Sequence, residues 1–333
     1  MRTRLTLPVI LVAGALILAA IPAVALAADP PQPAFGGPLA GSQEVPAVST
    51  TATGEGTAVI SPDGSKIWYY VTYSGLSGPA VAAHIHTGAA GQAGGVILPL
   101  KVSDSPMVGT LTSADFKASG PITSFAQAVA AIKGGQTYFN IHTAANGGGE
   151  IRGQIVAKGD AQFARLTGSQ EVPAVKTSAT GDGWALISSD GATITYYVSY
   201  TGLSGDAVAA HIHTGATGQA GGVILPLKVT ASPMVGTLTA ADFKASGPIT
   251  SFTDAVAAIK GGQTYFNIHT AANGGGEIRG QIGVTVPGSL PATSTQASEP
   301  GSGGSILPAL IGLLVFVALM VIGGRRLVPR AVP

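Results

Sequence analysis

The chain lacks cysteine altogether, and only 10% of its 333 residues are charged and 6% aromatic. Without cysteine it forms no disulfides, so its domains must depend on their hydrophobic cores for stability. Glycine, by contrast, accounts for 48 residues, and small and strand-forming residues are abundant. This composition is typical of a turn-rich β protein and argues against a helical enzyme or a disordered tail.

No stripe of basic residues runs through the body of the chain. Five of the 17 basic residues lie in the terminal segments, which leaves 12 against 16 acidic residues between them and a net charge of −4. A mildly acidic body without a basic stripe argues against nucleic acid as a partner. We also find no nucleophile elbow, phosphate-binding loop or pair of glycosidase-type carboxylates, and we assign no catalytic residue.

The N-terminal segment, residues 1–27, has the three parts of a secretory signal peptide. Arg2 and Arg4 supply the positive charge, residues 9–20 are apolar, and Ala25-Leu26-Ala27 forms a small-x-small cleavage site. We expect cleavage before Ala28, with an uncleaved membrane anchor as the alternative.

The C-terminal segment predicts a membrane anchor. Residues 306–324 are uncharged and just long enough to span a bilayer as a helix, and the arginines after them predict a cytoplasmic tail at 325–333. Residues 287–305 are rich in Pro, Ser, Thr and Gly, which predicts a flexible stalk. We therefore expect a single-pass cell-membrane protein whose body lies outside the cytoplasm.

The stalk contains Leu290-Pro291-Ala292-Thr293-Ser294, which is similar to a sortase sorting signal. Serine stands where the signal has its final glycine, and a long polar spacer follows. Both departures favour a retained transmembrane anchor over attachment to a cell wall.

Between the terminal segments lie two near-copies of one unit, offset by 127 residues. Residues 81–155 and 208–282 differ at only six of 75 aligned positions. A recent duplication accounts for this identity by itself, so the repeat sets domain borders and is not evidence of function. The expected domains are 35–157 and 161–286.

Each unit has the pattern of short strands with one short helix. Residues 57–60 and 66–73 predict a hairpin, and Ile67, Tyr69 and Val71 share one face of it by alternation. The other strands are expected around 81–86, 95–102 and 108–111, with a closing hairpin between 137–142 and 150–155.

The helix is predicted by Ser124 as N-cap, Gln127 three residues later, and Gly134 as the stop. Short strands at this spacing predict an all-β sandwich or a partly closed barrel.

All six histidines lie at matching positions in the two units. They are His84, His86 and His142, and their copies His211, His213 and His269. Alternation puts His84 and His86 on one side of their strand, with Ile85 facing the core, and puts His142 on the polar face of the closing hairpin. If the two strands are neighbours, the three imidazoles converge on a solvent-reachable face within their own domain.

Further polar side chains are expected on or near this face. They are Glu44, Asn140, Glu150 and Arg152 in the first unit and Glu171, Asn267, Glu277 and Arg279 in the second. Three histidines, two of them in a His-x-His pair, are a ligand set for copper or zinc that leaves a position open. The alternative is a structural hydrogen-bonded cluster in which Glu150 pairs with Arg152.

Three blocks of sequence carry a resemblance to a known family. They are Ser42-Gln43-Glu44-Val45-Pro46, Ala83-His84-Ile85-His86, and Tyr138-Phe139-Asn140-Ile141-His142-Thr143 followed by Gly149-Glu150-Ile151-Arg152-Gly153, and all recur in the second unit. Together they resemble the CHRD domain, the module named after chordin.

The resemblance implies two tandem immunoglobulin-like domains, with a distant kinship to copper/zinc superoxide dismutases and no settled activity. The His84-x-His86 strand is similar to the copper-binding strand of the dismutases, whose zinc-loop histidines and disulfide cysteines have no counterparts here.

The expected function is a membrane-tethered surface module that binds a protein, a glycan or a metal, because two linked sites gain avidity. The alternatives are a copper/zinc enzyme of superoxide-dismutase-like type and an architectural protein of the cell envelope.

Overall fold

The structure is a computed structural model that describes residues 32–283. The signal peptide, stalk, transmembrane helix and tail expected from the sequence lie outside these residues. Inside them, neither α-helix is long and apolar enough to cross a membrane.

The described residues are mostly β-strand, in two successive sets of elements. The first set is β1 (Gln32–Ala40), η1 (Gly41–Gln43), β2 (Thr53–Ile60), β3 (Ile67–Ser74), β4 (Ala80–Thr87), β5 (Val96–Pro99), β6 (Met107–Leu111), α1 (Phe125–Lys133), β7 (Thr137–Thr143) and β8 (Ile151–Gln154). The second set is β9 (Val156–Thr167), η2 (Gly168–Gln170), β10 (Thr180–Ile187), β11 (Ile194–Thr201), β12 (Ala207–Thr214), β13 (Val223–Pro226), β14 (Met234–Leu238), η3 (Ala240–Asp242), α2 (Phe252–Lys260), β15 (Thr264–Thr270) and β16 (Ile278–Gln281).

Each repeat is a β-sandwich whose two sheets share a hydrophobic core. In the first repeat β5, β4, β7 and β8 lie side by side in that order, and β1, β2, β3 and β6 form the other sheet. The sheets meet at one edge, where Ala40 of β1 pairs with Arg152 of β8. The second repeat has the same order, with part of β9 in the place of β1. The all-β fold in tandem is thus confirmed.

The predicted hairpins and helix form at the expected places. Strands β2 and β3 pair from Thr53↔Ser74 to Ile60↔Ile67, and Ile67, Tyr69 and Val71 face the core. Helix α1 begins where the Ser124 side chain accepts a hydrogen bond from Gln127 N, and Gly134 caps its end. Its buried side packs on the same core, so the helix is stabilised by burial as well as by its caps.

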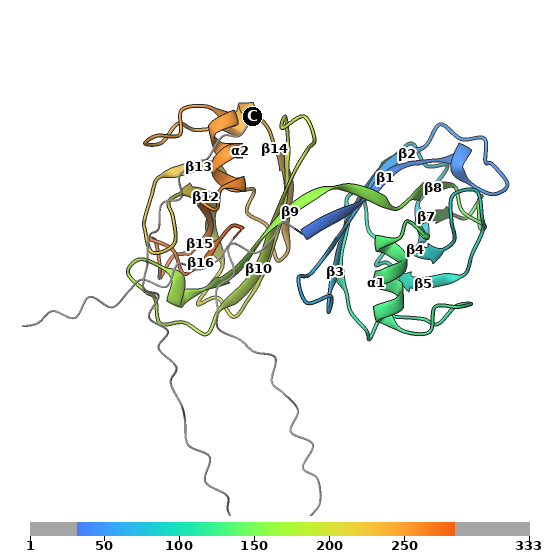
Figure 1. Cartoon of the computed structure of the whole chain (residues 1–333), viewed down its shortest axis with the longest axis horizontal. Coiled ribbons are helices and arrows are strands. Elements are labelled where there is room, and N and C mark those ends of the chain that lie inside the picture. The colour runs from blue at the N-terminus through green and yellow to red at the C-terminus, as the bar shows by residue number, and fades with distance from the viewer. Residues whose placement is uncertain (1–31, 284–333) are drawn as a thin grey trace, which may run out of the picture. The chain divides into compact units, whose positions relative to one another are not determined.

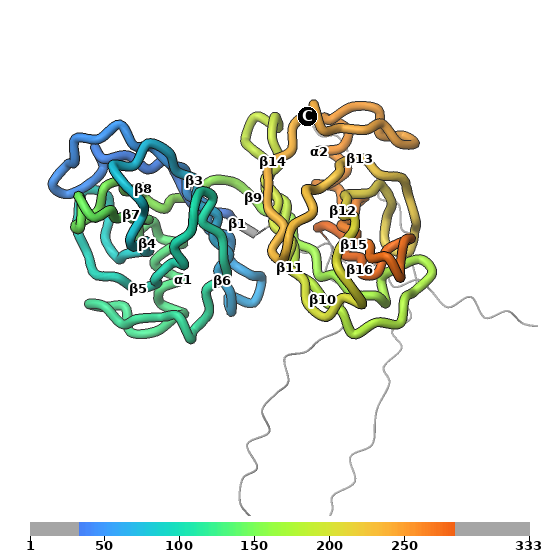
Figure 2. The backbone as a smooth tube through the Cα atoms, turned by 180° about the vertical axis from the view of Figure 1, so that it is seen from behind, coloured from blue at the N-terminus to red at the C-terminus, as the bar shows by residue number. Residues whose placement is uncertain are grey.

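Strand β9 belongs to both repeats (Figure 1 and Figure 2). Its first half pairs with β1 and its second half with β10, and both repeats lie within a single compact unit of the chain. The border expected at 157–161 therefore falls inside a continuous strand and not in a linker.

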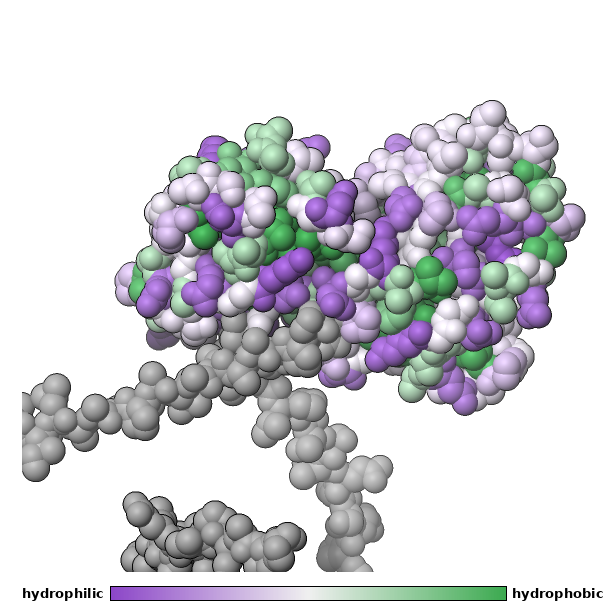
Figure 3. Space-filling view, turned by 45° about the horizontal axis from the view of Figure 1, so that its top comes forward, coloured by the Kyte–Doolittle hydropathy of each residue, from purple (hydrophilic) through white to green (hydrophobic). Residues whose placement is uncertain are grey.

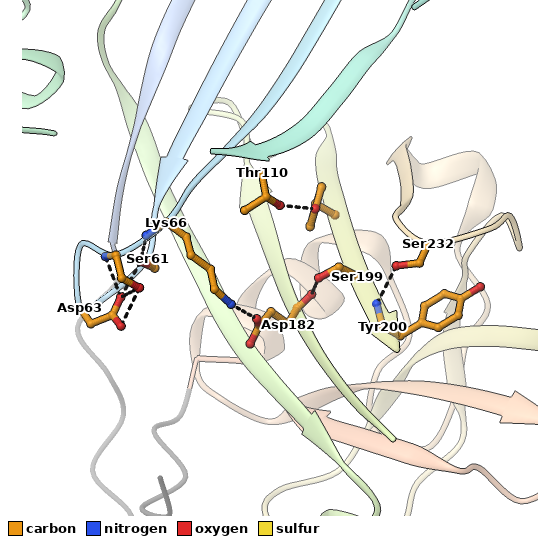
Figure 4. A network of polar contacts seen from close by, with 10 residues as sticks. Ser61, Asp63, Lys66, Thr110, Asp182, Ser199, Tyr200 and Ser232 are labelled. Atoms are coloured by element: carbon orange, nitrogen blue, oxygen red, sulfur yellow. Dashed lines mark hydrogen bonds and ion pairs between the residues drawn. The ribbon is translucent and has the colours of Figure 1, made fainter. Parts of the chain in front are cut away.

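A small hydrophobic cluster joins the repeats beside β9. Its largest members are Trp68 from the first repeat and Trp184 and Tyr197 from the second, with the Trp184 and Tyr197 rings stacked 5.7 Å apart. Lys66 Nζ donates to Asp182 Oδ2 at 2.7 Å (Figure 4). The hydroxyls of Thr110 and Tyr197 lie 2.9 Å apart. Trp68, on the outer face of β3, is thus buried although it does not belong to the core of its own sandwich.

Candidate metal site

The three histidines of the first repeat come together on the side of β4 and β7 that faces away from the sandwich core. The two strands are neighbours, with Ala82 paired to His142, His84 to Asn140, and His86 to Tyr138. Ile85, Phe139 and Ile141 alternate with these residues and lie in the core. One ring nitrogen from each histidine lies within 4.8 Å of the other two. The predicted convergence within one domain is therefore found.

Backbone carbonyls orient two of the three rings. The Nδ1 of His86 lies 2.9 Å from Gly94 O, and the Nδ1 of His142 lies 3.1 Å from Gly147 O. A carbonyl oxygen only accepts, so both Nδ1 atoms carry the proton and both Nε2 atoms carry a lone pair. The two loops that supply these carbonyls thereby set the tautomers of the two rings.

The third ring, His84, completes the cluster through its Nδ1. This atom lies 3.1 Å from the unprotonated Nε2 of His142. In the metal-free protein His84 Nδ1 therefore carries a proton and donates it to His142. This bond is one part of the structural hydrogen-bonded cluster that the sequence offers as the alternative to a metal site.

One buried nitrogen of the cluster has no hydrogen-bond partner. His86 Nε2 is buried and makes no hydrogen bond, although it carries a lone pair. An unpartnered buried polar atom is costly, so its position needs an explanation that the structural cluster alone does not supply.

The nitrogen positions fit a metal ion. Bonds of about 2.0–2.1 Å in a tetrahedral site place two ligand nitrogens roughly 3.4 Å apart. The 3.1 Å between His84 Nδ1 and His142 Nε2 is close to that value, and all separations within 4.8 Å need only small ring movements.

The cluster is more enclosed than expected. His84 and His86 are partly buried and His142 is buried, because the loops containing Gly94 and Gly147 lie over them. The expectation of a solvent-reachable face therefore holds only in part.

Burial keeps the three rings neutral. It lowers the pKa of His84 to about 4, assisted by the repulsion that would arise if His142 or His86 were also protonated and by the positive charge of Lys117. Burial likewise lowers the pKa of His86 and of His142, against the raising effect of their bonds to Gly94 and Gly147. Neutral imidazole is the form that binds a metal.

An aromatic stack supports His86 from the side. The His86 and Tyr138 rings are stacked 5.0 Å apart, and the guanidinium of Arg152 lies 3.5 Å from the Tyr138 ring centre on β7. Arg152 also donates to Ala89 O, and the Tyr138 hydroxyl accepts a bond from Gly94 N. The stack therefore ties the loop over the site to the strands beneath it.

Glu150 does not join the histidines, and it does not pair with Arg152. Its carboxylate accepts bonds from Thr50, from the amide and hydroxyl of Ser77, and from Thr143. Despite burial, these bonds hold its pKa down at about 2. The reason is that β8 begins at Ile151, so strand alternation does not extend to Glu150.

Glu44 lies beside the cluster and not at its rim. It follows η1, is buried, and accepts a hydrogen bond from Asn140 Nδ2 at 3.2 Å. Burial raises its pKa to about 7, against the lowering effects of Asn140 and Arg152. Glu44 Oε1 and Asn140 Oδ1 have no hydrogen-bond partner.

The second repeat has the same arrangement. His211 Nδ1 lies 3.1 Å from His269 Nε2, and His213 Nε2 is again buried without a partner. Glu171 pairs with Asn267, Arg279 stacks on Tyr265, and Glu277 bonds to Ser204, Thr270 and Thr177.

Strand alternation predicts that Tyr138 lies on the same face as the histidines, but it does not predict that Tyr138 stacks on His86. The carbonyls of Gly94 and Gly147 carry no sequence signal at all, because any residue has a carbonyl.

Comparison with known proteins identifies the repeated unit. A family model for the CHRD domain matches residues 35–155 and again 163–282. No curated protein and no solved structure matches the chain.

Proposed function

The chain belongs to the CHRD domain family, and we propose that each of its two domains is a binding module that holds one divalent transition-metal ion through three histidines. The ligand atoms are His84 Nδ1, His86 Nε2 and His142 Nε2, and their counterparts in the second repeat. The observation that carries the proposal is the buried, unpartnered lone pair of His86 Nε2, which a metal ion would satisfy.

Metal binding requires one change in the cluster. Both His86 and His142 already direct a lone pair inward, because Gly94 O and Gly147 O hold their other nitrogens. His84 must move its proton from Nδ1 to Nε2, which replaces its hydrogen bond to His142 by a metal bond. The rings are neutral before the ion arrives, so no proton has to leave a histidine at neutral pH.

The donor set favours copper or zinc. Three imidazoles suit both ions. Among the divalent first-row transition metals, the affinity of nitrogen ligands is highest for Cu²⁺ and is lower for Zn²⁺. A three-histidine site supplies a fourth position, at which the bound ion holds a water or an external ligand.

We also propose that both domains lie outside the cytoplasm. This location is supported by the signal-like segment at 1–27 and by the apolar run at 306–324 with arginines after it. Protease treatment of intact cells is expected to remove the repeats, and protection of the repeats would contradict this location. The two alternative functions, a copper/zinc enzyme and an architectural protein of the cell envelope, remain predictions from the sequence.

Metal titration of the purified full chain tests the function. We expect two Cu²⁺ or Zn²⁺ ions per chain, one for each three-histidine group. His86→Ala and His213→Ala should each remove one ion, and the double variant should bind none. In each single variant the unchanged repeat is the matched control. A wild-type chain without stoichiometric metal, or a double variant that still binds two ions, would overturn the proposal.

A further inference from the structure

A carboxyl group beside each histidine cluster, that of Glu44 in the first repeat, is not among the proposed metal ligands. The Glu44 side chain is 8% exposed, and its Oε2 accepts from Asn140 Nδ2, while its Oε1 has no partner. Asn140 Oδ1, also buried and without a partner, lies next to it. Both free oxygens face Gly149, where an added Cβ would lie 2.7 Å from Glu44 Oε1 and 2.3 Å from Asn140 Oδ1.

The surroundings of Glu44 leave its charge state open to change. Asn140 on β7 is its hydrogen-bond partner, Gly149 closes the hairpin loop over it, and Arg152 on β8 is the charged group that acts on it. The Arg152 guanidinium bonds to Ala89 O and Gln154 Oε1 and stacks on Tyr138. It forms no ion pair with Glu44, so the carboxyl lacks the contact that would fix it as an anion. Its pKa, raised by burial to about 7, allows both forms at neutral pH.

Asn140, the hydrogen-bond partner of Glu44, lies on the strand next to the one that carries His84 and His86. Asn140 pairs with His84 across β4 and β7, and Arg152 pairs with Asn140 across β7 and β8. The carboxyl and the imidazoles thus belong to one partly buried polar layer. Charges act over longer distances in such a layer than in water, so a divalent ion there favours the carboxylate form.

We propose that Glu44, and Glu171 in the second repeat, is the proton-releasing partner of the metal site. Binding of the ion to the three imidazoles drives the neighbouring carboxyl to its anionic form, and one proton per site passes to solvent. The metal affinity of each repeat therefore rises with pH as this carboxyl ionises. The inference rests on the proposed metal binding.

Proton counting on the full-length protein tests it. Zn²⁺ is titrated calorimetrically at about pH 6, where a carboxyl with a pKa of about 7 is almost fully protonated, in buffers that differ in protonation enthalpy, which gives the protons released per ion. The variants are Glu44→Gln, Glu171→Gln and the double variant, because glutamine keeps the shape and cannot ionise. We expect about one proton per site in the wild type, half the total in each single variant, and none in the double variant.

The affinities give a second readout. Between about pH 6 and pH 8 the wild-type affinity should rise several-fold, whereas that of the double variant should stay flat. The number of ions bound should be unchanged, since glutamine replaces no ligand. Each single variant carries an unaltered repeat as its internal control.

The outcomes separate the two proposals. A wild type that binds no stoichiometric Zn²⁺ overturns both. Normal stoichiometry with undiminished proton release in the double variant overturns this inference alone, and assigns the proton to another group, such as a metal-bound water. If the glutamine variants do not fold, the wild type still decides, because metal binding without proton release below pH 7 contradicts the role of Glu44.

Discussion

At the scale of single residues, the site depends on where protons reside. Two carbonyls fix the tautomers of His86 and His142, and burial keeps all three rings neutral. A histidine whose folded pKa lies below its unfolded value stabilises the fold above the unfolded pKa. That stability is lost as the pH falls through the folded pKa.

The metal-free protein should therefore become less stable as the pH falls from about 6.5 toward 4, the window set by the lowered histidine pKa values. Urea unfolding in the presence of a chelator measures this dependence. A double variant with His84→Gln and His211→Gln should show a shallower loss.

Glu44 works in the opposite direction in the same window. Its folded pKa is raised to about 7, so its contribution is present at low pH and is lost as the pH rises through 7. Glu44→Gln should therefore steepen the acid loss. Equal slopes in the wild type and in both kinds of variant would contradict the assignment.

Glu150 should be among the most sensitive side chains, because it is buried and bonded to Thr50, Ser77 and Thr143. Glu150→Ala leaves these groups without an acceptor and should cost about 2–4 kcal/mol of unfolding free energy. Chemical unfolding at neutral pH measures it. The surface residue Glu55 is the control, and Glu55→Ala should cost less than about 1 kcal/mol. Equal costs would contradict the packing described for Glu150.

At the scale of elements, β4 carries two of the three ligands, and the closing hairpin of β7 and β8 carries the third and most of the residues around them. Its strands carry His142, Asn140 and Arg152, and its loop supplies Gly147 O and the close approach of Gly149 to Glu44. Only Gly149 of the three consecutive glycines has a positive φ, +124°, and only there would a Cβ collide with neighbours.

Gly149→Ala is accordingly expected to destabilise the protein by about 1–3 kcal/mol through backbone strain and displacement of Asn140. Gly148→Ala is the matched control, because a Cβ there meets nothing within 4 Å and its φ is not positive. Thermal or chemical unfolding of the two variants measures both losses of stability. A neutral Gly149→Ala, or an equally damaging Gly148→Ala, would contradict the loop geometry.

Much of the hairpin could be predicted from the sequence, because alternation along a strand fixes which side each residue faces. His84, His86 and His142 follow that rule and meet. Glu150 does not, since it precedes the first residue of β8 and turns toward Ser77 and Thr143. The burial of Glu44 was not predictable, because it depends on how the segment after β1 folds over the sheet.

At the scale of the whole molecule, the two repeats share strand β9 and a small core. Trp68 and Trp184 fill this core, and each stands where the other repeat has a threonine, Thr195 and Thr57. Their burial was not predictable, because alternation describes a single sheet and not what packs outside it. Elsewhere the face drawn in Figure 3 mixes hydrophilic and hydrophobic residues.

The tryptophans should therefore matter to stability although they lie outside both sandwich cores. Trp184, fully buried against Trp68 and Tyr197, is the stronger test. Trp184→Ala should cost about 3–5 kcal/mol of unfolding free energy, as for other large buried side chains. Thr57→Ala, at the equivalent position of the first repeat, should cost far less. A near-neutral Trp184→Ala would contradict the shared core.

The most direct test of the metal sites is anomalous diffraction at the zinc edge from crystals of the protein grown with Zn²⁺. The account predicts two peaks per chain, each about 2.0–2.1 Å from one Nδ1 and two Nε2 atoms of a histidine triplet. His84 Nδ1 and His142 Nε2 should then both bind the ion and no longer each other. Triplets without a peak, with the 3.1 Å bond from His84 to His142 still in place, would contradict it.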